Sequence, residues 1–433
     1  MNKTYLTNVT LTDGSRRDVC LGGSASGCGD SPWPGIKLRE PIRCTTAGEM
    51  SVPNGARHID AAGKLLMPAL FDLHAKVEIA GCSKRESVMR TGQAAQQGGV
   101  WGMLVMPTPG FCFDNSDKLD SFRDMVLHRS AAEMLPAGCI SIGMQGEQQA
   151  PYNTLMARGV NILSDAGRMP HSLLMLHRAM KYAASTGYIF ALAGDVPELT
   201  RNTYMHPGTT SYRLGLHGTP SCAEEIGLET IIRLAQDAGT KLHVQTVSTA
   251  GGVEIIRRAK AAGCRVTAEV ALHHLLFTHE AVGDYDTTFK TLPPLRDRAD
   301  CEALIAGVKD GTIDCIVSDH TPCIPFAKKQ DFITAPQGMV MLDTMLPAIY
   351  THLVKPGLLS WDDVVRACCV NPLRVLARSE EMDDEEEGFS RGVPLLLFDP
   401  MVCSSVTPDT LPCGTLNSPF LGQELCGSVT LPI

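Results

Sequence analysis

The stretch LLMPALFDLHAK, residues 65–76, decides the fold of this 433-residue chain. It is a short apolar run that ends in polar residues, and residues 86–97 after it have the apolar spacing of a helix. The next segment, VWGMLVMP at residues 100–107, is again apolar, and helical spacing follows over residues 118–129. Apolar runs of this length, bounded by Gly or Pro and separated by helices, predict the buried strands of a parallel sheet.

The same alternation of strand and helix continues as far as residue 320. The further apolar runs are GCISIGM (138–144), VNILSD (160–165), YIFALAG (188–194), KLHVQTVST (241–249), CRVTAEV (264–270) and TIDCIVSDH (312–320). Helical patterns lie between them, over residues 171–185, 223–238 and 252–261. The chain therefore holds eight predicted strands, and this number suits a closed (β/α)8 barrel of the TIM type better than an open doubly wound sheet.

The two ends of the chain have a different pattern. Residues 1–65 are short β segments broken by Gly, Pro and Ser, and we expect them to form the N-terminal part of a small β-sandwich domain. Residues 66–378 then form the α/β barrel, which ends in helices over 341–353 and 361–376. Residues 379–433 begin with EEMDDEEEG, an acidic surface loop, and end in the strands GVPLLLFDP and GSVTLPI, which return to the small β domain.

Composition excludes several classes of function. Acidic residues number 47 against 38 basic ones, a net charge of -9, which disfavours nucleic acid or an anionic membrane as partner. No apolar run approaches the roughly 18 residues that span a bilayer. The first residues lack the apolar stretch of a signal peptide, so we expect a cytoplasmic protein. Its sixteen cysteines are scattered, with no CxxC motif, and are expected to be reduced thiols that mostly pack as small buried hydrophobes.

Many segments, in this order along the chain, resemble bacterial dihydroorotases of the amidohydrolase superfamily. They are MPALFDLHAK, GQAAQQGGV, MPTP, FDN, NILSDAG, TTSYRLGLHGTPSCAEEI, LHVQTVSTAGGVEIIRRAKAAG, TAEVALHHLLFTHE, FKTLPPLR and GTIDCIVSDHTP. The likeness runs from about residue 64 to residue 376. It implies the barrel, a setting in pyrimidine biosynthesis, and two metal ions, usually zinc, that activate a water molecule at the C-terminal mouth of the barrel.

Three positions where this family has histidine ligands carry other residues here. His-x-His after the first strand is His74-Ala75-Lys76, and the ammonium group of Lys76 repels a dication. Leu192 stands where the fifth strand ends in a histidine, and Thr246 where the sixth does. Leucine cannot ligate a metal, and a threonine hydroxyl is a poor zinc ligand. The resemblance therefore predicts that a binuclear centre is lost.

Three family positions still carry groups that could bind a metal. His74 is the first imidazole, Asp165 is one of the two acids of the family's Ser-Asp-Asp-Gly segment, and Asp319 matches the catalytic aspartate that moves the proton. A catalytic zinc needs three protein ligands and a water. We therefore expect no cofactor, or at most one zinc ion held by these three residues.

Four positions that bind substrate in the family are also altered. Glu78 replaces an arginine and reverses the charge that faces a substrate carboxylate. Thr108 and Leu292 replace asparagines, and Cys323 replaces a histidine. No substrate-binding residue is therefore retained among these four.

His74 and Asp319 permit two interpretations. They could be catalytic residues that still act, with Asp319 as a general base. They could instead form a buried polar group in which Lys76 neutralises Asp319 across the barrel mouth, so that no buried charge is left unpaired. We favour the second interpretation.

Other tempting polar residues have structural interpretations. His243 is expected to be a hydrogen-bonded core histidine, and His320 to orient the Asp319 loop. His273–His274 is expected to lie on a strand, with its two rings on opposite faces. Glu224–Glu225 opens a helix, where acids complement the helix dipole.

Two functions follow from the resemblance. The first is a non-catalytic dihydroorotase homologue, similar to the inactive relatives that form the scaffold subunit of aspartate carbamoyltransferase. The second is an active cyclic-amide hydrolase with a mononuclear or metal-free site that uses Asp319 as general base. A homodimer is expected because homodimers are common in the family, and the catalytic chain of aspartate carbamoyltransferase is the expected partner.

Overall fold

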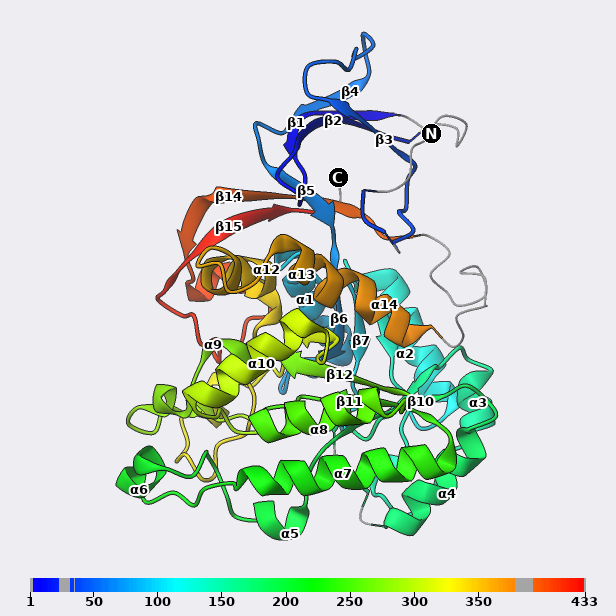
Figure 1. Cartoon of the computed structure of the whole chain (residues 1–433), viewed down its shortest axis with the longest axis vertical. Helices are drawn as coiled ribbons and strands as arrows, with labels where there is room; N and C mark the ends of the chain where they lie inside the picture. Colours follow the sequence, from blue (N-terminus) through cyan, green and yellow to red (C-terminus); the bar gives the residue numbers. More distant parts are fainter. Residues whose placement is uncertain are drawn as a thin grey trace.

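A computed structural model describes residues 3–22, 32–34, 36–167, 169–170, 172–377 and 392–431. The molecule has a β domain, built from both ends of the chain, and a larger α/β part below it in Figure 1. The acidic run at residues 380–388 lies outside the described residues, so its predicted surface position stays a prediction.

Eight strands form the predicted barrel. They are β6 (Leu70–Ala75), β7 (Val100–Val105), β8 (Glu133–Pro136), β9 (Ile162–Leu163), β10 (Ile189–Ala193), β11 (Lys241–Gln245), β12 (Val266–Ala271) and β13 (Cys315–Val317). Neighbouring strands pair in parallel in two groups, β6 to β8 and β9 to β13. Parallel bridges join Gly138 to Leu163 and Ala75 to His320, and so close the ring between the groups. The (β/α)8 barrel is thus confirmed. The predicted position of its third strand is wrong: β8 is Glu133–Pro136, whereas the predicted run at residues 138–144 ends in the 3-10 helix Ile142–Met144.

Helices cover the outside of the barrel because each buries one apolar stripe. The long helices are α1 (Lys84–Gln97), α2 (Ser116–Arg129), α4 (Leu173–Ala183), α7 (Ser221–Ala238), α8 (Ala250–Ala261) and α10 (Arg298–Asp310). In α7, for example, Gly227, Leu228, Ile231, Ile232 and Ala235 are buried at the spacing of one helix face. Ser, Thr, Asn or Asp side chains cap the N-termini of the other five.

Shorter helices lie in the loops and before the C-terminal strands. They are α3 (Tyr152–Met156), α5 (Pro197–Thr200), α6 (Thr209–Leu214), α9 (Leu272–Leu276), α11 (Pro325–Lys328), α12 (Met345–Ile349), α13 (Trp361–Val365) and α14 (Asn371–Leu376). No helix in the described part of the chain is long and apolar enough to cross a membrane.

The β domain is one seven-stranded sheet in the order β15-β14-β5-β1-β2-β3, with β4 paired to β1. Its strands are β1 (Thr4–Thr10), β2 (Arg16–Leu21), β3 (Ile42–Thr46), β4 (Arg57–Asp60), β5 (Leu65–Pro68), β14 (Leu395–Ser405) and β15 (Glu424–Thr430). In Figure 1, β14 and β15 lie below β1 to β3 and beside α12. The stretch that decides the fold serves both domains: β5 pairs with β14, and β6 begins the barrel two residues later, after Ala69.

One prediction about the cysteines is wrong. Cys403 and Cys426 form a disulfide, because the antiparallel pairing of β14 and β15 places these two residues directly opposite each other. The other described cysteines are free thiols, and most of them are buried, as predicted.

Candidate functional site

A cavity of about 490 Å³ opens at the C-terminal ends of the barrel strands. Eight of the ten positions singled out in the sequence line it: His74, Lys76, Thr108, Asp165, Thr246, Leu292, Asp319 and Cys323. Leu192 instead lies fully buried in the hydrophobic core, and Glu78 turns to the loop after β7, where it accepts a hydrogen bond from the Gly110 amide at 2.9 Å. The C-terminal mouth is where barrel enzymes place their catalytic groups.

A buried carboxylate, Glu269 on β12, holds two histidines at the floor of the mouth. His74 Nδ1 donates to Glu269 Oε1 at 2.6 Å, and His243 Nε2 donates to Glu269 Oε2 at 2.9 Å. The other nitrogen of His243 lies 2.9 Å from Thr267 Oγ1, so the prediction of a hydrogen-bonded core histidine is confirmed. Burial alone would raise the pKa of Glu269, but the charge of His74 and the two hydrogen bonds outweigh burial and lower it to about 2.

Asp319 lies on the opposite side of His74 from Glu269. His74 Nε2 is 3.6 Å from Asp319 Oδ1, and Lys76 Nζ is 3.9 Å from the same oxygen. Burial would lower the pKa of His74, but the negative charges of Glu269 and Asp319 raise it above its ordinary value. Burial raises the pKa of Asp319, against the effect of Lys76 and His74. The predicted neutralisation of Asp319 by Lys76 is therefore present, with two cations and two anions in one chain of contacts.

His273 also faces Asp319, with its Nε2 4.0 Å from Asp319 Oδ2. The prediction that His273–His274 lies on a strand is wrong, because both residues fall in the short helix α9, which follows β12 directly. Their rings are neighbours, with centroids 4.4 Å apart. Burial and the nearby His274, His74 and Lys76 lower the pKa of His273 well below its ordinary value. His273 is therefore a buried neutral imidazole beside Asp319.

Asp165 binds the protein's own backbone. Its Oδ1 accepts hydrogen bonds from the amides of Ile140 and Ser141 at 2.9 and 3.2 Å, and its Oδ2 accepts one from the Ser141 hydroxyl at 2.5 Å. These bonds fix the loop after β8 at the rim of the mouth. The carboxylate of Asp165 thus has a structural use in this chain.

Two strand ends carry an uncommon backbone. Thr246, after β11, has φ 47°, and Asp319, after β13, has φ 45°. A left-handed conformation costs an L-residue roughly 1–2 kcal/mol, and it is a genuine outlier for a β-branched side chain such as threonine. Strained backbone of this kind clusters at functional sites. Both residues line the mouth, so strained backbone of the kind found at functional sites borders this cavity.

The comparisons with known proteins identify the family. A family model described as dihydro-orotase-like matches residues 63–251. A dihydroorotase of Leifsonia xyli subsp. xyli is 34% identical over 428 residues, 98% of this chain and 93% of that protein. A dihydroorotase of Pelotomaculum thermopropionicum is 36% identical over 86% of each chain.

This chain belongs to the dihydroorotase family. Solved structures agree on the fold. An L-hydantoinase (dihydropyrimidinase) from Arthrobacter aurescens matches with a TM-score of 0.79 at 20% identity, and covers 100% of this chain and 95% of its own. A dihydropyrimidinase from Brevibacillus agri NCHU1002 has a TM-score of 0.75 at 18% identity, over 99% of this chain and 92% of its own.

The donor groups at the mouth do not fit the two zinc ions usual in the dihydroorotase family. His74 Nδ1 is bound to Glu269, and Asp165 is bound to the loop after β8. Within the described residues, the only three His, Cys, Asp or Glu side chains whose donor atoms lie within 4.8 Å of one another are Cys403, Glu424 and Cys426 in the β domain. The groups predicted to hold a metal therefore share the cavity without converging on one point.

Three of the positions for which the resemblance implies altered substrate contacts have the following surroundings. Thr108 accepts a hydrogen bond from the Phe111 amide at 3.2 Å, and Leu292 is exposed at the rim. The Cys323 thiol lies 3.7 Å from the carbonyl oxygens of Thr321 and Gln337. None of these side chains presents a cation to a substrate carboxylate.

Three buried polar residues that line the mouth or contact His74 were not singled out by the sequence analysis. Glu269 is one, and the acid inside the apolar strand VTAEVA is the pattern that could have revealed it. Gln245 is another: its Nε2 lies 3.4 Å from His74 Nδ1, and its Oε1 accepts from Ser164. The third is Arg296, which is 2% exposed and donates to the Thr219 carbonyl and the Ser248 hydroxyl at 2.8 and 3.1 Å.

Glu224 lies in the first turn of α7, as predicted, and the prediction for His320 is also confirmed. The Glu224 carboxylate has a second role that was not predicted: it accepts hydrogen bonds from the amides and hydroxyls of Ser248 and Thr249, and so holds the loop after β11. His320 accepts a hydrogen bond from the Leu342 amide at 3.3 Å, which fixes the segment that follows Asp319.

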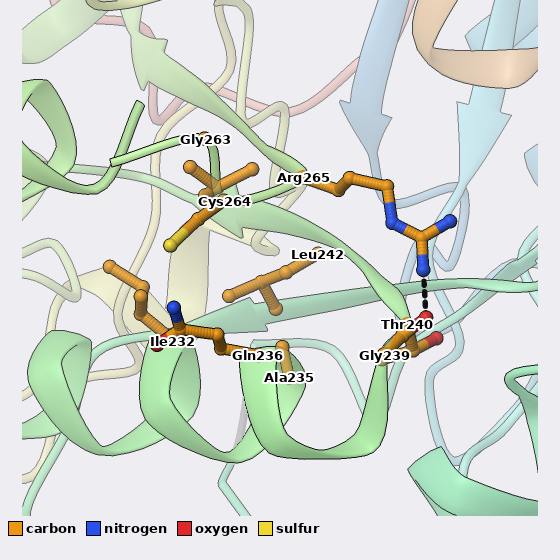
Figure 2. Close-up of a pocket in the computed structure, with 10 residues that line it drawn as sticks. Ile232, Ala235, Gln236, Gly239, Thr240, Leu242, Gly263, Cys264 and Arg265 are labelled. Atoms are coloured by element: carbon orange, nitrogen blue, oxygen red, sulfur yellow. Dashed lines mark hydrogen bonds between the residues drawn. The ribbon is translucent and has the colours of Figure 1, made fainter. Parts of the chain in front are cut away.

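A smaller cavity, of about 120 Å³, lies at the opposite end of the strands. Figure 2 shows it between the C-terminal end of α7 and the beginnings of β11 and β12, with Ile232, Ala235 and Leu242 on its wall and Arg265 bonded to the Gly239 carbonyl. It lies away from the polar network, at the face of the barrel where residues serve stability.

Proposed function

We propose that this chain is a dihydroorotase homologue of pyrimidine biosynthesis that does not turn over dihydroorotate. In this proposal it is a cytoplasmic homodimer that serves as a scaffold or regulatory subunit for the catalytic chain of aspartate carbamoyltransferase. Its mouth holds at most one zinc ion. The family membership supports the pathway, and the chemistry of the mouth supports the loss of activity.

The observation that carries the proposal is the neutral network around His74. A dihydroorotase of the family places imidazoles and carboxylates around metal ions, and each ion lowers the pKa of its bound water. Here the ammonium of Lys76 lies 3.9 Å from Asp319, and His74 lies between Asp319 and Glu269. The protein's own cations therefore balance its buried anions. A divalent ion added at this place would be repelled by Lys76 and by protonated His74.

The intact barrel supports a structural rather than a catalytic role. One hydrophobic core extends from the β domain through the barrel and into α12 to α14. The stability of the fold comes from this core, whereas catalysis depends on a few side chains at the mouth. Loss of activity is therefore compatible with a rigid subunit that holds a partner.

A second candidate is an active cyclic-amide hydrolase that uses Asp319 as general base. One observation favours it: Asp319 lines the cavity, and burial raises its pKa towards the range in which a carboxylate accepts a proton effectively. This candidate has a mononuclear or metal-free site and predicts turnover that depends on Asp319; added chelator distinguishes the two, since it would abolish turnover only at a mononuclear site.

A direct test measures both directions of the reaction. Protein purified without chelator is assayed for hydrolysis of dihydroorotate and for cyclisation of carbamoyl aspartate, and its zinc and manganese contents are measured. The dihydroorotase of Leifsonia xyli subsp. xyli, prepared in the same way, is the positive control. We expect no turnover above background and less than one metal per chain. Turnover that Asp319→Asn abolishes would support the second candidate instead.

The scaffold role has its own test. The chain is co-expressed with the aspartate carbamoyltransferase catalytic chain of the same organism, and the two are separated by size-exclusion chromatography with light scattering. We expect one complex of fixed stoichiometry, and a homodimer when this chain is expressed alone. Two separate peaks at micromolar concentration would refute the scaffold role and leave the result of the activity test unaffected.

A further inference from the structure

Two cysteines meet beside the barrel mouth. Cys112 lies in the loop between β7 and α2, and Cys139 follows β8. Their sulfur atoms are 3.7 Å apart, and the Cys139 amide donates to the Phe113 carbonyl at 3.0 Å, so the backbone keeps the two segments together. Cys139 is buried and Cys112 is partly exposed. One thiol of the pair is therefore open to a ligand and the other is not.

A groove of about 270 Å³ leads to the partly exposed thiol. Apolar side chains of Phe111, Phe113, Phe122 and Met125 form part of its wall together with Cys112. The charged groups on the wall are two lysines and one acid, Lys84, Lys118 and Asp117.

The two lysines differ in their surroundings. Lys84 Nζ lies 5.4 Å from the centre of the Phe111 ring, and Lys118 Nζ lies 2.7 Å from Asp114 Oδ1. Among the described residues, no carboxylate oxygen lies within 4.0 Å of Lys84 Nζ, so Lys84 is the lysine of the groove that is available to an anionic group of a ligand.

The two thiols have unequal chemistry. The hydrogen bond with Cys139 lowers the pKa of Cys112, although burial and the nearby Asp114 act against it. The same hydrogen bond, together with burial, raises the pKa of Cys139. A thiolate is the nucleophile in disulfide exchange. Cys112 is therefore suited to attack first and Cys139 to act second.

We propose that this groove and the Cys112–Cys139 pair form a reaction site for a small anionic disulfide. The Cys112 thiolate attacks one sulfur of the disulfide RS–SR, its S–S bond breaks, and one RS⁻ leaves. Cys139 then attacks the Cys112 sulfur of the mixed disulfide, a protein disulfide forms, and the second RS⁻ leaves. Two protein thiols are oxidised, one small disulfide is reduced to two thiols, and the two protons pass to the departing thiolates.

The bond formed would link the two loops that carry residues of the mouth. The loop after β7 supplies Thr108 and Pro109 to the large cavity, and the loop after β8 leads through Ser141 to Met144. This site thus lies outside the network of His74 and Asp319, and it does not depend on whether the barrel is catalytic.

The test uses the full-length reduced protein and oxidised glutathione, a net anionic disulfide, at neutral pH. After quenching with an alkylating agent, intact mass and non-reducing peptide mapping follow the products. We expect a Cys112–Cys139 crosslink in the parent, a glutathione adduct at Cys112 in Cys139→Ser, and no product at the pair in Cys112→Ser. Cys222→Ser, which changes an exposed cysteine on α7, is the control and should react as the parent does.

A charge comparison tests the groove itself. Cystamine, a cationic disulfide, should react more slowly than oxidised glutathione, and Lys84→Glu should lower the glutathione rate by roughly threefold. Lys309→Glu, on the exposed surface of α10, should leave the rate unchanged. Equal rates for the two disulfides would overturn the anionic selection. Recovery of reduced Cys112 and Cys139, with an adduct at Cys222, would overturn the site.

Discussion

Replacing Glu269 by glutamine removes the buried anion that holds His74 and His243 and leaves the volume of the side chain nearly unchanged. The pKa of Glu269 lies at about 2 instead of its ordinary 4.5. At about 1.4 kcal/mol for each pH unit, this difference corresponds to about 3 kcal/mol of folding free energy. We therefore expect Glu269→Gln to lower the free energy of unfolding by about 3 kcal/mol near pH 6.

The sign of its pH dependence follows from the two pKa directions. A carboxylate whose pKa is lowered by folding stabilises the fold at pH values above its pKa in the unfolded chain. For Glu269 this contribution is lost as the pH falls from 4.5 towards 2. His74 has a raised pKa, so its contribution is present below 6.5 and is lost as the pH rises through its folded value. The free energies of unfolding of the parent and Glu269→Gln should therefore differ most between pH 4.5 and pH 6.5. They should converge at lower and at higher pH.

The assay is urea unfolding followed by fluorescence, with linear extrapolation to water, at several pH values from mildly alkaline to about pH 3. Glu302→Gln, at an exposed position of α10, is the matched control and should change stability by less than about 0.5 kcal/mol. A loss below about 1 kcal/mol for Glu269→Gln near pH 6, or a difference that stays constant at acidic pH, would refute the electrostatic account of the network.

Three further changes test the mouth and are measured by the same unfolding assay. Thr246→Gly should stabilise the protein by about 1 kcal/mol, since glycine adopts φ 47° freely, and a loss of stability would contradict the strain at Thr246. Lys76→Met should lower the free energy of unfolding by about 2 kcal/mol at pH 7, because Asp319 loses a cation 3.9 Å away. This loss should become smaller as Asp319 is protonated at lower pH, and a loss that does not change with pH would contradict the pairing of Lys76 with Asp319. Buried Arg296 Nη2 lies 4.0 Å from Glu224 Oε2, so Arg296→Met should cost about 3 kcal/mol and leave that carboxylate without its cation; Glu224→Gln in the same chain should recover part of the loss, and strictly additive losses would show that the two residues are not coupled.

The barrel could be predicted from the sequence because each of its parts has a local pattern. Apolar runs between helices predicted seven of the eight strands; β8 was missed because Glu133–Pro136 is a short segment that follows α2 closely and has no long apolar run. The division of residues 65–76 between two sheets could not be predicted in this way, because β5 and β6 form one continuous apolar run. Only the pairing of β5 with β14, more than 300 residues later, separates them.

The site could be predicted only in part, for a similar reason. The family resemblance placed most candidate residues in one cavity, although it could not show which of them bind one another. Glu269 meets His74 across 195 residues of sequence, and Cys403 meets Cys426 through the register of two strands. The long-range partners of a charged or sulfur-bearing side chain leave no periodicity in the sequence. These long-range partners decide whether the Asp165 carboxylate faces a metal or binds the backbone amides of Ile140 and Ser141.

The loops at the strand ends explain how a barrel mouth can lose ligands and keep its shape. Glu224 binds the backbone just after Thr246, and buried Asp72 binds the amide and hydroxyl of Ser318, just before Asp319. These hydrogen bonds fix the backbone next to Thr246 and Asp319. They do not involve the side chains of these two residues. The left-handed backbone of Thr246 costs roughly 1–2 kcal/mol, which is small beside the stabilisation from one continuous core. The backbone geometry of the strand ends and the ability to bind a metal thus depend on different residues. Metal binding can therefore be lost while the backbone geometry is kept.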